Sequence, residues 1–402
     1  MSMRKALLLA IVLGCAPAAA HAQAAGDAVK IGVIGDQSSS FAHLAGPGSV
    51  IAAQMAVEDF GGKVLGKPIV VISADHQNKP DVAASISRRW IDVEGVNAFA
   101  SIESTGAALT VQEIGKEKQK AVMLISAAGS DVFVNENCSP VGALWTWNIK
   151  SVVETTARKI VESGRKKWFF LTMDYAGGHD IEKKASDAVR RAGGEVVGSV
   201  RHPTNTADFS SFLLQAQSSQ ADVIALANAG ADTINAIKQA NEFGLTKNSL
   251  IAPMLLFITD VHGLGLQTAQ GLWETTSFYW DRTDETRAWS KRFFERHKAM
   301  PTMIQAGVYS SVSHYLKAVQ AAGSVDAKTV IAKMRELPVN DIFATNGKLR
   351  EDGLMLHDLY VLQVKSPSES KGPWDYYKVL STVPAAEAYW PLSESRCPLI
   401  KH

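Results

Sequence analysis

The chain has 402 residues, and its charges almost cancel, with 41 Lys and Arg against 40 Asp and Glu. These charges are scattered along the chain, which argues against nucleic acid as a partner. Its length exceeds what one hydrophobic core usually serves, so we expect two domains.

The N-terminal segment has the pattern of a secretory signal peptide. Arg4 and Lys5 precede the apolar run 6–12, and the small-residue end 20–22 reads Ala-His-Ala, so we expect cleavage after 1–22. The run is too short to span a bilayer, and no later segment approaches the roughly 20 apolar residues that a membrane helix needs. The mature protein is therefore expected to work outside the cytoplasm.

A second interpretation of the same segment uses Cys15. The sequence Val-Leu-Gly-Cys at 12–15 resembles a lipoprotein cleavage site, which would leave Cys15 acylated and attached to a membrane. Because Leu13 is larger than is usual before such a cysteine, we favour the secreted form.

From Val29 onward, short β-branched runs alternate with amphipathic segments of helical length, which is typical of βαβ units around parallel sheets. This α/β pattern occurs twice. The expected strands are 29–34, 69–74, 98–102 and 121–126, then 168–173, 195–200, 222–227 and 250–254. The expected helices are 49–60, 81–94 and 105–116, then 152–163, 181–192, 209–217 and 232–243.

The last third of the chain departs from this alternation. A β-branched and aromatic stretch, 271–280, precedes helical patterns at 285–298 and 304–322. Two strands, 347–350 and 357–365, are expected to flank the turn 351–353. The tail from Ser366 lacks a helical period but is rich in Trp and Tyr, so we expect an ordered, irregular wrap.

Three cysteines are present. If Cys15 leaves with the signal peptide, Cys138 and Cys397 remain as an even pair in an oxidising compartment, and we expect a disulfide between them. The alternative is two unpaired buried thiols.

Signatures of catalysis are missing from the sequence. It contains no G-x-S-x-G, G-x-G-x-x-G, G-x-x-x-x-G-K-[ST], H-E-x-x-H or C-x-x-C pattern. The histidines are dispersed without metal-binding spacing, among them His43, His76, His179, His202 and His357. We therefore expect a binding protein rather than an enzyme, with no metal and no cofactor.

Four groups of residues carry a family resemblance. They are 174–176 with 178–179, 278–281, 300–302 with 305–309, and 357–360. In order and spacing they resemble periplasmic solute-binding proteins of branched-chain amino acid type ABC importers, the Leu/Ile/Val-binding family. The similarity covers essentially the whole mature chain.

The resemblance implies a type I periplasmic binding protein fold, in which two Rossmann-like lobes are joined by a hinge of three crossovers. The crossovers would fall near Asn148, Thr275 and Leu356. Lobe 1 would comprise 27–147 and 276–355, and lobe 2 would comprise 148–275 and 356–402 with the C-terminal tail. The family implies a periplasmic monomer that delivers a small ligand to ABC permease membrane subunits.

Within the family, the chain looks closest to members that carry aromatic carboxylates, such as hydroxybenzoates and phenylpropenoids. Ligands of open α/β sheets bind beyond the carboxyl ends of the strands. The candidate ligand-binding residues at those positions are Phe41, Glu103, Ser104, Thr105, Ala128, Gly129, Ser130, Tyr175, Ala176, Asn228, Gly230, Met254, Leu255 and Phe278.

A ligand carboxylate would fit two turns of the first lobe. Ser104, Thr105, Ala128 and Ser130 offer hydroxyls, small side chains and free backbone N–H groups at helix starts. The alternative is that Ser104 and Ser130 only cap their helices, each stabilising its helix by about 1 kcal/mol.

The choice between an aromatic acid and an amine-bearing ligand rests on acidic residues. Amino acid binders of the family place an acid at the strand end where this chain has Pro-Met-Leu-Leu at 253–256. A buried ammonium without a counter-charge costs several kcal/mol, which disfavours a branched-chain amino acid or amide, our alternative ligand. Glu103 argues the other way if it faces the cleft, whereas in the alternative it points to solvent.

Aromatic rings complete the expected site. Phe41 and Tyr175 lie on loops expected to face the cleft, and Phe278 or Trp280 follows the middle crossover, where rings could enclose a planar ligand. For 278–280, burial in the core is an equal alternative.

Overall fold

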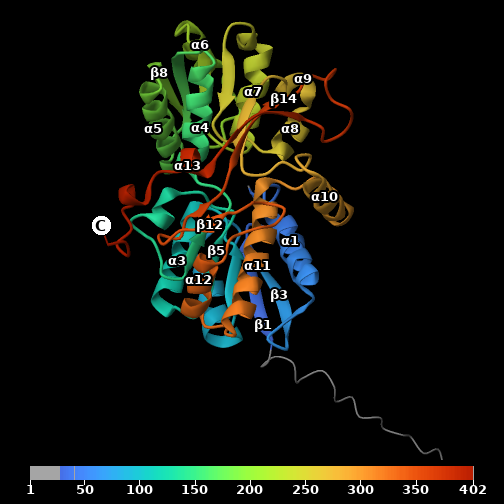
Figure 1. The fold of residues 1–402 in the computed structure, drawn as a ribbon. Helices are drawn as coiled ribbons and strands as arrows, with labels where there is room; N and C mark the ends of the chain where they lie inside the picture. Colours follow the sequence, from blue (N-terminus) through green and yellow to red (C-terminus); the bar gives the residue numbers. More distant parts are fainter. Residues whose placement is uncertain (1–27, 40, 402) are drawn as a thin grey trace, which may run out of the picture.

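The computed structural model describes residues 28–39 and 41–401, and of Ala176 it describes the backbone alone. The predicted signal peptide 1–22 and Cys15 lie outside these residues. Two bodies lie one above the other, each with helices around a sheet (Figure 1). We call the lower body lobe 1 and the upper body lobe 2.

Lobe 1 is built on a six-stranded sheet of order β2-β3-β1-β4-β5-β6. All neighbours run parallel except β2, which is antiparallel to β3. The four predicted strands of this half are confirmed, whereas the short strands β2 and β6 were not predicted. The bounds are β1 (Val29–Gly35), β2 (Lys63–Val64), β3 (Lys67–Asp75), β4 (Ala98–Ser101), β5 (Val122–Ile125) and β6 (Gly142–Leu144).

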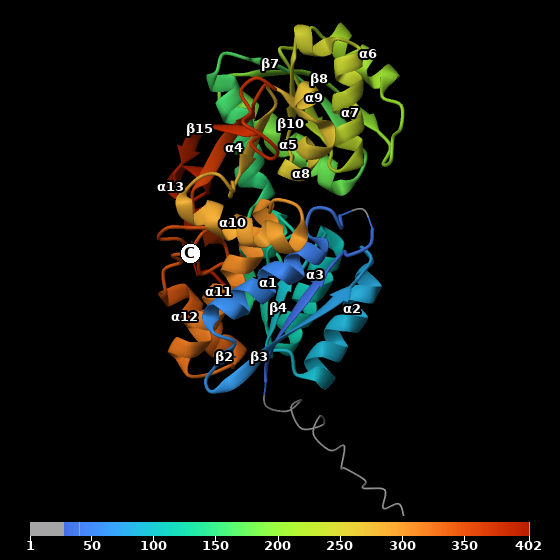
Figure 2. The same ribbon diagram turned by 90° about the vertical axis from the view of Figure 1, so that its right-hand side faces the viewer.

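The helices of lobe 1 come from both ends of the chain. The first group is α1 (Gly46–Phe60), α2 (Pro80–Arg89), the π-helix η1 (Trp90–Glu94), α3 (Thr105–Lys118) and the 3-10 helix η2 (Asp131–Val134). The second group is α10 (Asp284–His297), α11 (Met303–Ala322) and α12 (Ala327–Glu336), the last of which was not predicted. Helix α11 packs against α1 and α12, so residues beyond 300 complete this lobe (Figure 2).

Lobe 2 repeats the arrangement around a four-stranded parallel sheet of order β10-β9-β7-β8. Its strands, all predicted, are β7 (Lys167–Met173), β8 (Glu195–His202), β9 (Val223–Ala227) and β10 (Leu250–Pro253). Its helices are α4 (Ile149–Glu162), α5 (Ala176–Arg191), α6 (Ser210–Ser218), α7 (Ala231–Glu242), η3 (Leu245–Lys247), α8 (Ile258–Leu264) and α9 (Leu266–Ala269).

A three-stranded antiparallel sheet of order β11-β14-β15 adjoins lobe 2. Its strands are β11 (Trp273–Thr276), β14 (Leu359–Val364) and β15 (Tyr377–Val383), followed by α13 (Ala385–Ala388) and η4 (Leu392–Glu394). The expectation of an irregular tail is therefore wrong for 377–383. The Ser and Pro content concealed this strand, because its order comes from main-chain pairing with β14.

The predicted pairing of 347–350 with 357–365 is also wrong. Strand β12 (Lys348–Leu349) pairs with β13 (Met355–Leu356), and β14 pairs with β11 and β15 instead. The Asp352 carboxylate accepts the backbone N–H of Leu354 at 3.2 Å and a hydrogen bond from Arg350 Nε at 3.0 Å. This turn is tight enough for the chain to return at residue 355.

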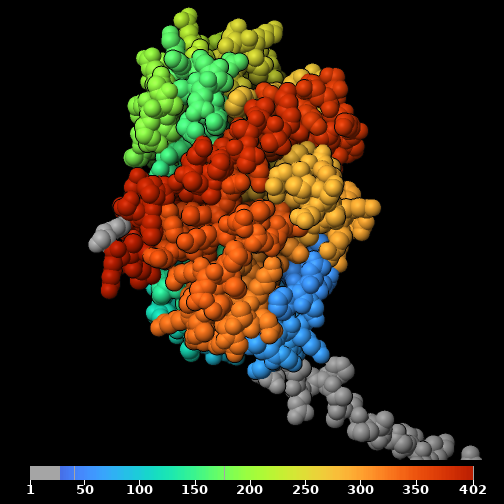
Figure 3. Space-filling view, viewed as in Figure 1, coloured from blue at the N-terminus to red at the C-terminus, as the bar shows by residue number. Residues whose placement is uncertain are grey.

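The C-terminal segment crosses the boundary between the lobes, where it runs diagonally over one face of the molecule (Figure 3). Its end is fixed to lobe 1 by a disulfide between Cys397 and Cys138, whose Cα atoms lie 5.6 Å apart. The predicted disulfide is confirmed, and the alternative of two free thiols is wrong. Among residues 28–39 and 41–401, no helix is both long and apolar enough to cross a membrane.

Candidate functional site

The candidate residues follow the carboxyl ends of parallel strands in both lobes. In lobe 1 residues 36–39 and 41 follow β1, and the segments 102–105 and 126–130 follow β4 and β5. In lobe 2 the segments 174–176, 228–230 and 254–255 follow β7, β9 and β10. Each group lies at one edge of its sheet, which is where ligands of such sheets bind.

The turn after β4 has an unusual backbone. Ser101, Ile102 and Ser104 have φ angles of 72°, 53° and 59°, in the left-handed region that side chains rarely adopt. Ile102 is β-branched and fully buried, so its conformation is costly. Backbone bonds hold the turn in place, because Ile102 N donates to Ile34 O at 2.9 Å and Ser101 O accepts from Ser126 N at 2.8 Å. Such strain concentrates at functional sites.

Glu103 lies inside this turn and does not point to solvent. Its side chain is 2% exposed, and its Oε2 accepts the backbone N–H of Asp36 at 2.9 Å. Burial raises the pKa of Glu103 well above the ordinary value, the Asp36 N–H opposes the rise, and the charges of Asp36 and Asp75 add to it. The environment thus favours a neutral carboxyl.

Asp36 organises the loop that carries Phe41. Its carboxylate accepts backbone N–H groups from Ser39 at 2.8 Å and Phe41 at 3.0 Å, and the Ser39 hydroxyl. Burial alone would raise the pKa of Asp36, but these hydrogen bonds outweigh it and lower the pKa. Phe41 is half-buried and packs against the main hydrophobic core.

The two serines of the proposed carboxylate seat do not act as helix caps. Within the described chain, neither the Ser104 nor the Ser130 side chain accepts a capping hydrogen bond at the start of α3 or η2. The capping alternative is therefore wrong. Thr105 is the first residue of α3 and is exposed, while Ala128 is buried.

Trp147, which was not among the candidates, connects the two lobes. Its ring lies over Gly129, where a Cβ atom would stand 2.6 Å from the ring. The same ring meets Phe257, which follows β10, edge-on at 6.5 Å between centroids. The Trp147 Nε1–H is buried and has no acceptor among the described residues. Gly129 therefore makes room for this indole.

In lobe 2 the side chain of Asn228, which follows β9, is bonded within the protein. Asn228 is fully buried, and its Oδ1 accepts the Thr233 hydroxyl at 2.7 Å. Its Nδ2 lies 3.3 Å from His202 Nε2. Gly230, with φ of 62°, is the N-cap residue that precedes α7. Asn228 is thus committed to an internal network.

The other lobe 2 candidates are mainly apolar. Met254 and Leu255 are buried, whereas Tyr175 is 39% exposed at the start of α5, where its ring covers Gly177. Phe278 is buried and meets Trp289 edge-on at 5.8 Å, so it belongs at least partly to the core.

Acidic groups reach the boundary between the lobes from positions outside the predicted site. Asp131 of lobe 1 pairs with Lys184 of α5 at 2.6 Å. Asp260 of α8 lies 3.5 Å from His43 Nε2 of lobe 1. Glu274 of β11 is buried beside Asp260. Carboxylates are therefore present on the lobe 2 side although 253–256 is apolar.

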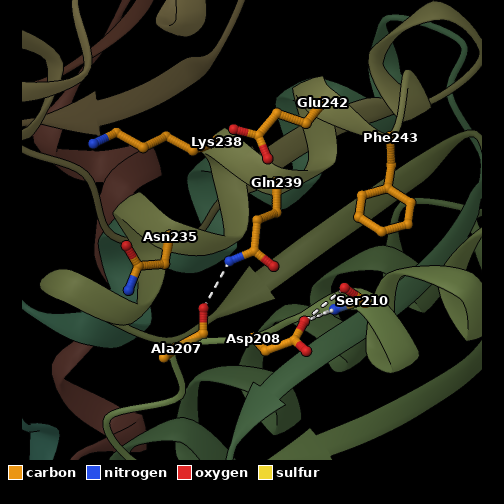
Figure 4. Close-up of a pocket in the computed structure, with 8 residues that line it drawn as sticks. All are labelled: Ala207, Asp208, Ser210, Asn235, Lys238, Gln239, Glu242 and Phe243. Atoms are coloured by element: carbon orange, nitrogen blue, oxygen red, sulfur yellow. Dashed lines mark hydrogen bonds between the residues drawn. The ribbon is translucent and has the colours of Figure 1, made fainter.

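A depression of about 350 Å³ lies elsewhere, on the flank of lobe 2 (Figure 4). It is lined by Ala207, Asp208, Ser210, Asn235, Lys238, Gln239, Glu242 and Phe243. Gln239 bridges its two sides, because its Nε2 donates to Ala207 O at 2.8 Å. All these residues come from one lobe, so we do not assign the ligand site to this depression.

Trp147, Phe257 and Glu274 are not predicted from the sequence. Trp147 follows the unpredicted strand β6, and Phe257 lies one residue beyond the segment 253–256, which starts at the last residue of β10. A usable signal existed for Glu274, because a charged residue within a β-branched strand demands a structural or functional explanation.

Comparisons with known proteins agree with this geometry. A family model described as periplasmic binding protein matches residues 28–373. A periplasmic binding protein from Burkholderia mallei is 49% identical, with a TM-score of 0.88 over 93% of this chain and 100% of that chain. A branched chain amino acid ABC transporter periplasmic ligand-binding protein from Burkholderia xenovorans is 42% identical, with a TM-score of 0.87 over 92% of this chain and 99% of that one.

Proteins of lower sequence identity also match this chain over most of its length. Leu/Ile/Val-binding protein homolog 6 from Brucella melitensis is 28% identical over 80% of this chain and 82% of its own length. A solute-binding protein from R. palustris in complex with 4-hydroxybenzoate is 21% identical, with a TM-score of 0.80 over 89% of this chain and 97% of that one. At that identity the likeness concerns the fold, which is the type I fold expected above.

Proposed function

This chain belongs to the periplasmic binding protein family, and from that premise we propose that it captures a small aromatic carboxylate between its lobes. It is the substrate-binding component of a branched-chain amino acid type ABC transporter. In our proposal the chain is divided near Asn148, Thr275 and Leu356, the lobes close over a hydroxybenzoate or phenylpropenoid, and the closed form delivers it to the permease.

The observation that carries the ligand class is the aromatic pair between the lobes. Trp147 and Phe257 meet edge-on at 6.5 Å, and the buried indole N–H lacks an acceptor among the described residues. Edge and face contacts of this kind suit a planar ring. A ligand carboxylate oxygen would satisfy the indole donor, which otherwise costs about 1–3 kcal/mol.

The lobe 1 turn supports the same ligand. Ser104 is free of a capping bond, and the first N–H groups of α3 have no partner within the helix. These groups favour an anion. A neutral Glu103 would not repel a carboxylate and could donate to it. The 4-hydroxybenzoate complex of the R. palustris protein supports aromatic acids as ligands that this fold accommodates.

Thermal-shift measurements with benzoate, 4-hydroxybenzoate, cinnamate and leucine test the proposal. A ligand at 100 times its Kd adds about 2.7 kcal/mol to the free energy of unfolding, so aromatic acids should raise the Tm. Stabilisation by leucine-type ligands alone would refute the aromatic assignment while leaving the receptor class intact.

An amine-bearing ligand is the second candidate, and Asp260 with Glu274 favours it. These buried carboxylates could neutralise an ammonium from the lobe 2 side, which the apolar residues 253–256 cannot do. Glu103→Gln tests the lobe 1 side of this alternative. An ammonium ligand held by Glu103 would lose orders of magnitude in affinity, whereas a carboxylate ligand would bind as well or better.

A further inference from the structure

A small cavity lies where the β11–β14–β15 sheet meets the segment leading into α11. Its volume is about 10 Å³, which is room for roughly one water molecule. Glu274, Tyr279 and Tyr377 contribute polar side chains, while Phe257, Phe278 and Thr302 are among its other walls.

The polar atoms around this cavity are unsatisfied. Within the described chain, Glu274 Oε2 and the hydroxyls of Tyr279 and Tyr377 are buried and make no hydrogen bond of normal geometry. The Tyr377 hydroxyl nevertheless lies close enough to Glu274 to act on its carboxyl group. The Glu274 side chain is only 5% exposed. Buried polar groups without partners are rare in native proteins, because each loses its contact with water and gains no hydrogen bond in exchange. The cavity therefore suits a polar guest that can donate to a carboxyl oxygen.

The walls come from two parts of the molecule that meet between the lobes. Glu274 and Tyr377 belong to the sheet beside lobe 2. Thr302 precedes α11, and its hydroxyl donates to Leu44 O of lobe 1 at 3.1 Å. A relative movement of the lobes would open or close this cavity.

The cavity also adjoins the candidate cleft. Phe257 lines it and meets Trp147 at the lobe boundary, and Phe278 lines it as well. We propose that Glu274 is a specificity-determining residue whose free carboxyl oxygen accepts a hydrogen bond from a hydroxyl or ammonium group of the ligand. This inference rests on the proposed function, since it needs a ligand bound between the lobes.

Protonation distinguishes the two donor groups. Burial raises the pKa of Glu274 to about 8, the Tyr377 hydroxyl opposes the rise, and the charge of Asp260, itself 3.5 Å from His43, adds to it. At pH 7 the carboxyl of the free protein is then mostly neutral. A ligand hydroxyl can bind while Glu274 keeps its proton. A ligand ammonium requires the ionised carboxylate, so its binding releases that proton.

Isothermal titration calorimetry of the full mature protein tests the inference. The ligands are benzoate, 4-hydroxybenzoate, 4-(aminomethyl)benzoate and leucine. The wild type should bind at least one of the three donor-bearing ligands about 10-fold or more tightly than benzoate. Titrations at pH 7 in buffers of different ionisation enthalpy should detect close to one proton released with an ammonium ligand and none with the hydroxyl ligand.

Two variants of Glu274 distinguish its role as a hydrogen-bond acceptor from its role as a negative charge. Glu274→Met removes the acceptor and should abolish the preference over benzoate. Glu274→Gln keeps an acceptor oxygen, so 4-hydroxybenzoate should stay within about 3-fold of the wild type, whereas an ammonium ligand should lose about 100-fold. Glu285→Met, at an exposed position of α10, is the matched control, and a thermal melt of each variant verifies folding.

The outcomes separate this inference from the proposed function. Equal binding of benzoate and 4-hydroxybenzoate, unchanged in both Glu274 variants, overturns the role of Glu274 and leaves the aromatic receptor intact. Binding of leucine alone, lost in Glu274→Gln, refutes the aromatic ligand and supports the role of Glu274. Leucine binding that neither variant alters, or binding of none of the four ligands, overturns both.

Discussion

The strand-end edges of the two lobes occupy equivalent places in similar sheets, yet their chemistry differs. In lobe 1 the turn 101–104 is strained, Glu103 is a buried acid, and Ser104 is not used as a cap. In lobe 2 Asn228 is satisfied by Thr233 and contacts His202. Lobe 1 thus has polar groups to offer a ligand, whereas the lobe 2 edge contributes mostly apolar and aromatic walls.

This contrast gives each edge a different expected response to mutation. Polar substitutions at the lobe 2 edge should affect folding, because the groups there stabilise each other. Polar substitutions at the lobe 1 edge should affect ligand binding, because some groups there lack protein partners. The strain in lobe 1 is retained although it costs stability, which is the usual mark of a functional segment.

The largest effect on stability should come from removing the disulfide that joins lobe 1 to the C-terminal segment. Cys138 follows the segment that contains Ser130, and the disulfide to Cys397 closes a loop with a sequence separation of 259 residues. Replacing both cysteines by serine should lower the free energy of unfolding by about 2–5 kcal/mol, because the unfolded chain gains freedom. Guanidinium denaturation measures this. A loss below about 1 kcal/mol would show that the bridge does not constrain the fold.

Asn228→Ala should separate stability from binding at the lobe 2 edge. The change leaves the buried Thr233 hydroxyl without its acceptor, so the free energy of unfolding should fall by about 1–3 kcal/mol. Urea denaturation and a Kd measured on the folded fraction give the two quantities. Asn248→Ala, at an exposed position, should stay within about 0.5 kcal/mol. A stable variant with a large loss of affinity would instead make Asn228 a ligand-binding residue.

Glu103→Gln should change the pH dependence of stability. The pKa of Glu103 is raised in the folded protein, so above the unfolded pKa the unfolded chain releases a proton that the folded chain keeps. The raised pKa of Glu103 therefore stabilises the folded protein, and this stabilisation is complete at acidic pH. It falls by about 1.4 kcal/mol per pH unit as the pH rises from the pKa of Glu103 in the unfolded chain toward its pKa in the folded protein. Gln cannot titrate, so the variant should gain on the wild type as pH rises. Parallel curves for both proteins across acidic to neutral pH would contradict this.

The smallest effect on stability is expected for Ser104→Ala. Its hydroxyl caps no helix, so the free energy of unfolding should change by less than about 0.5 kcal/mol. The affinity for the carboxylate ligand should nevertheless fall about 10-fold, because a hydrogen bond to a charged group contributes about 1.5–3 kcal/mol. Ser211→Ala on α6 serves as the surface control. Unchanged affinity would remove Ser104 from the proposed site and reduce the contrast between the edges.

Much of the fold could be predicted from local patterns. Eight of the ten strands in the two large sheets follow from the sequence, because buried parallel strands are short β-branched runs separated by amphipathic helices, and only the short strands β2 and β6 do not. Pairing by main-chain contacts was harder to predict. The sequence predicts irregular chain at β15 and the wrong partner for β12, because edge strands carry little hydrophobic pattern of their own.

The candidate site was predictable only in outline. Strand ends locate a ligand edge, which is how Glu103 and Ser104 became candidates. Their roles as ligand contacts stay predictions. Trp147, Phe257 and Glu274 come together at the lobe boundary from three distant segments, and no local pattern links residues so far apart in the chain.

The sequence by itself determined the alternation of strands and helices and the cysteine pair, because hydrophobic periodicity and cysteine parity are local or countable properties. Only the tertiary structure decided which buried groups lack partners. Whether Glu103 and Glu274 are charged, and whether Ser104 caps a helix, depends on burial and on atoms contributed by distant segments. Those quantities exist only after the chain has folded.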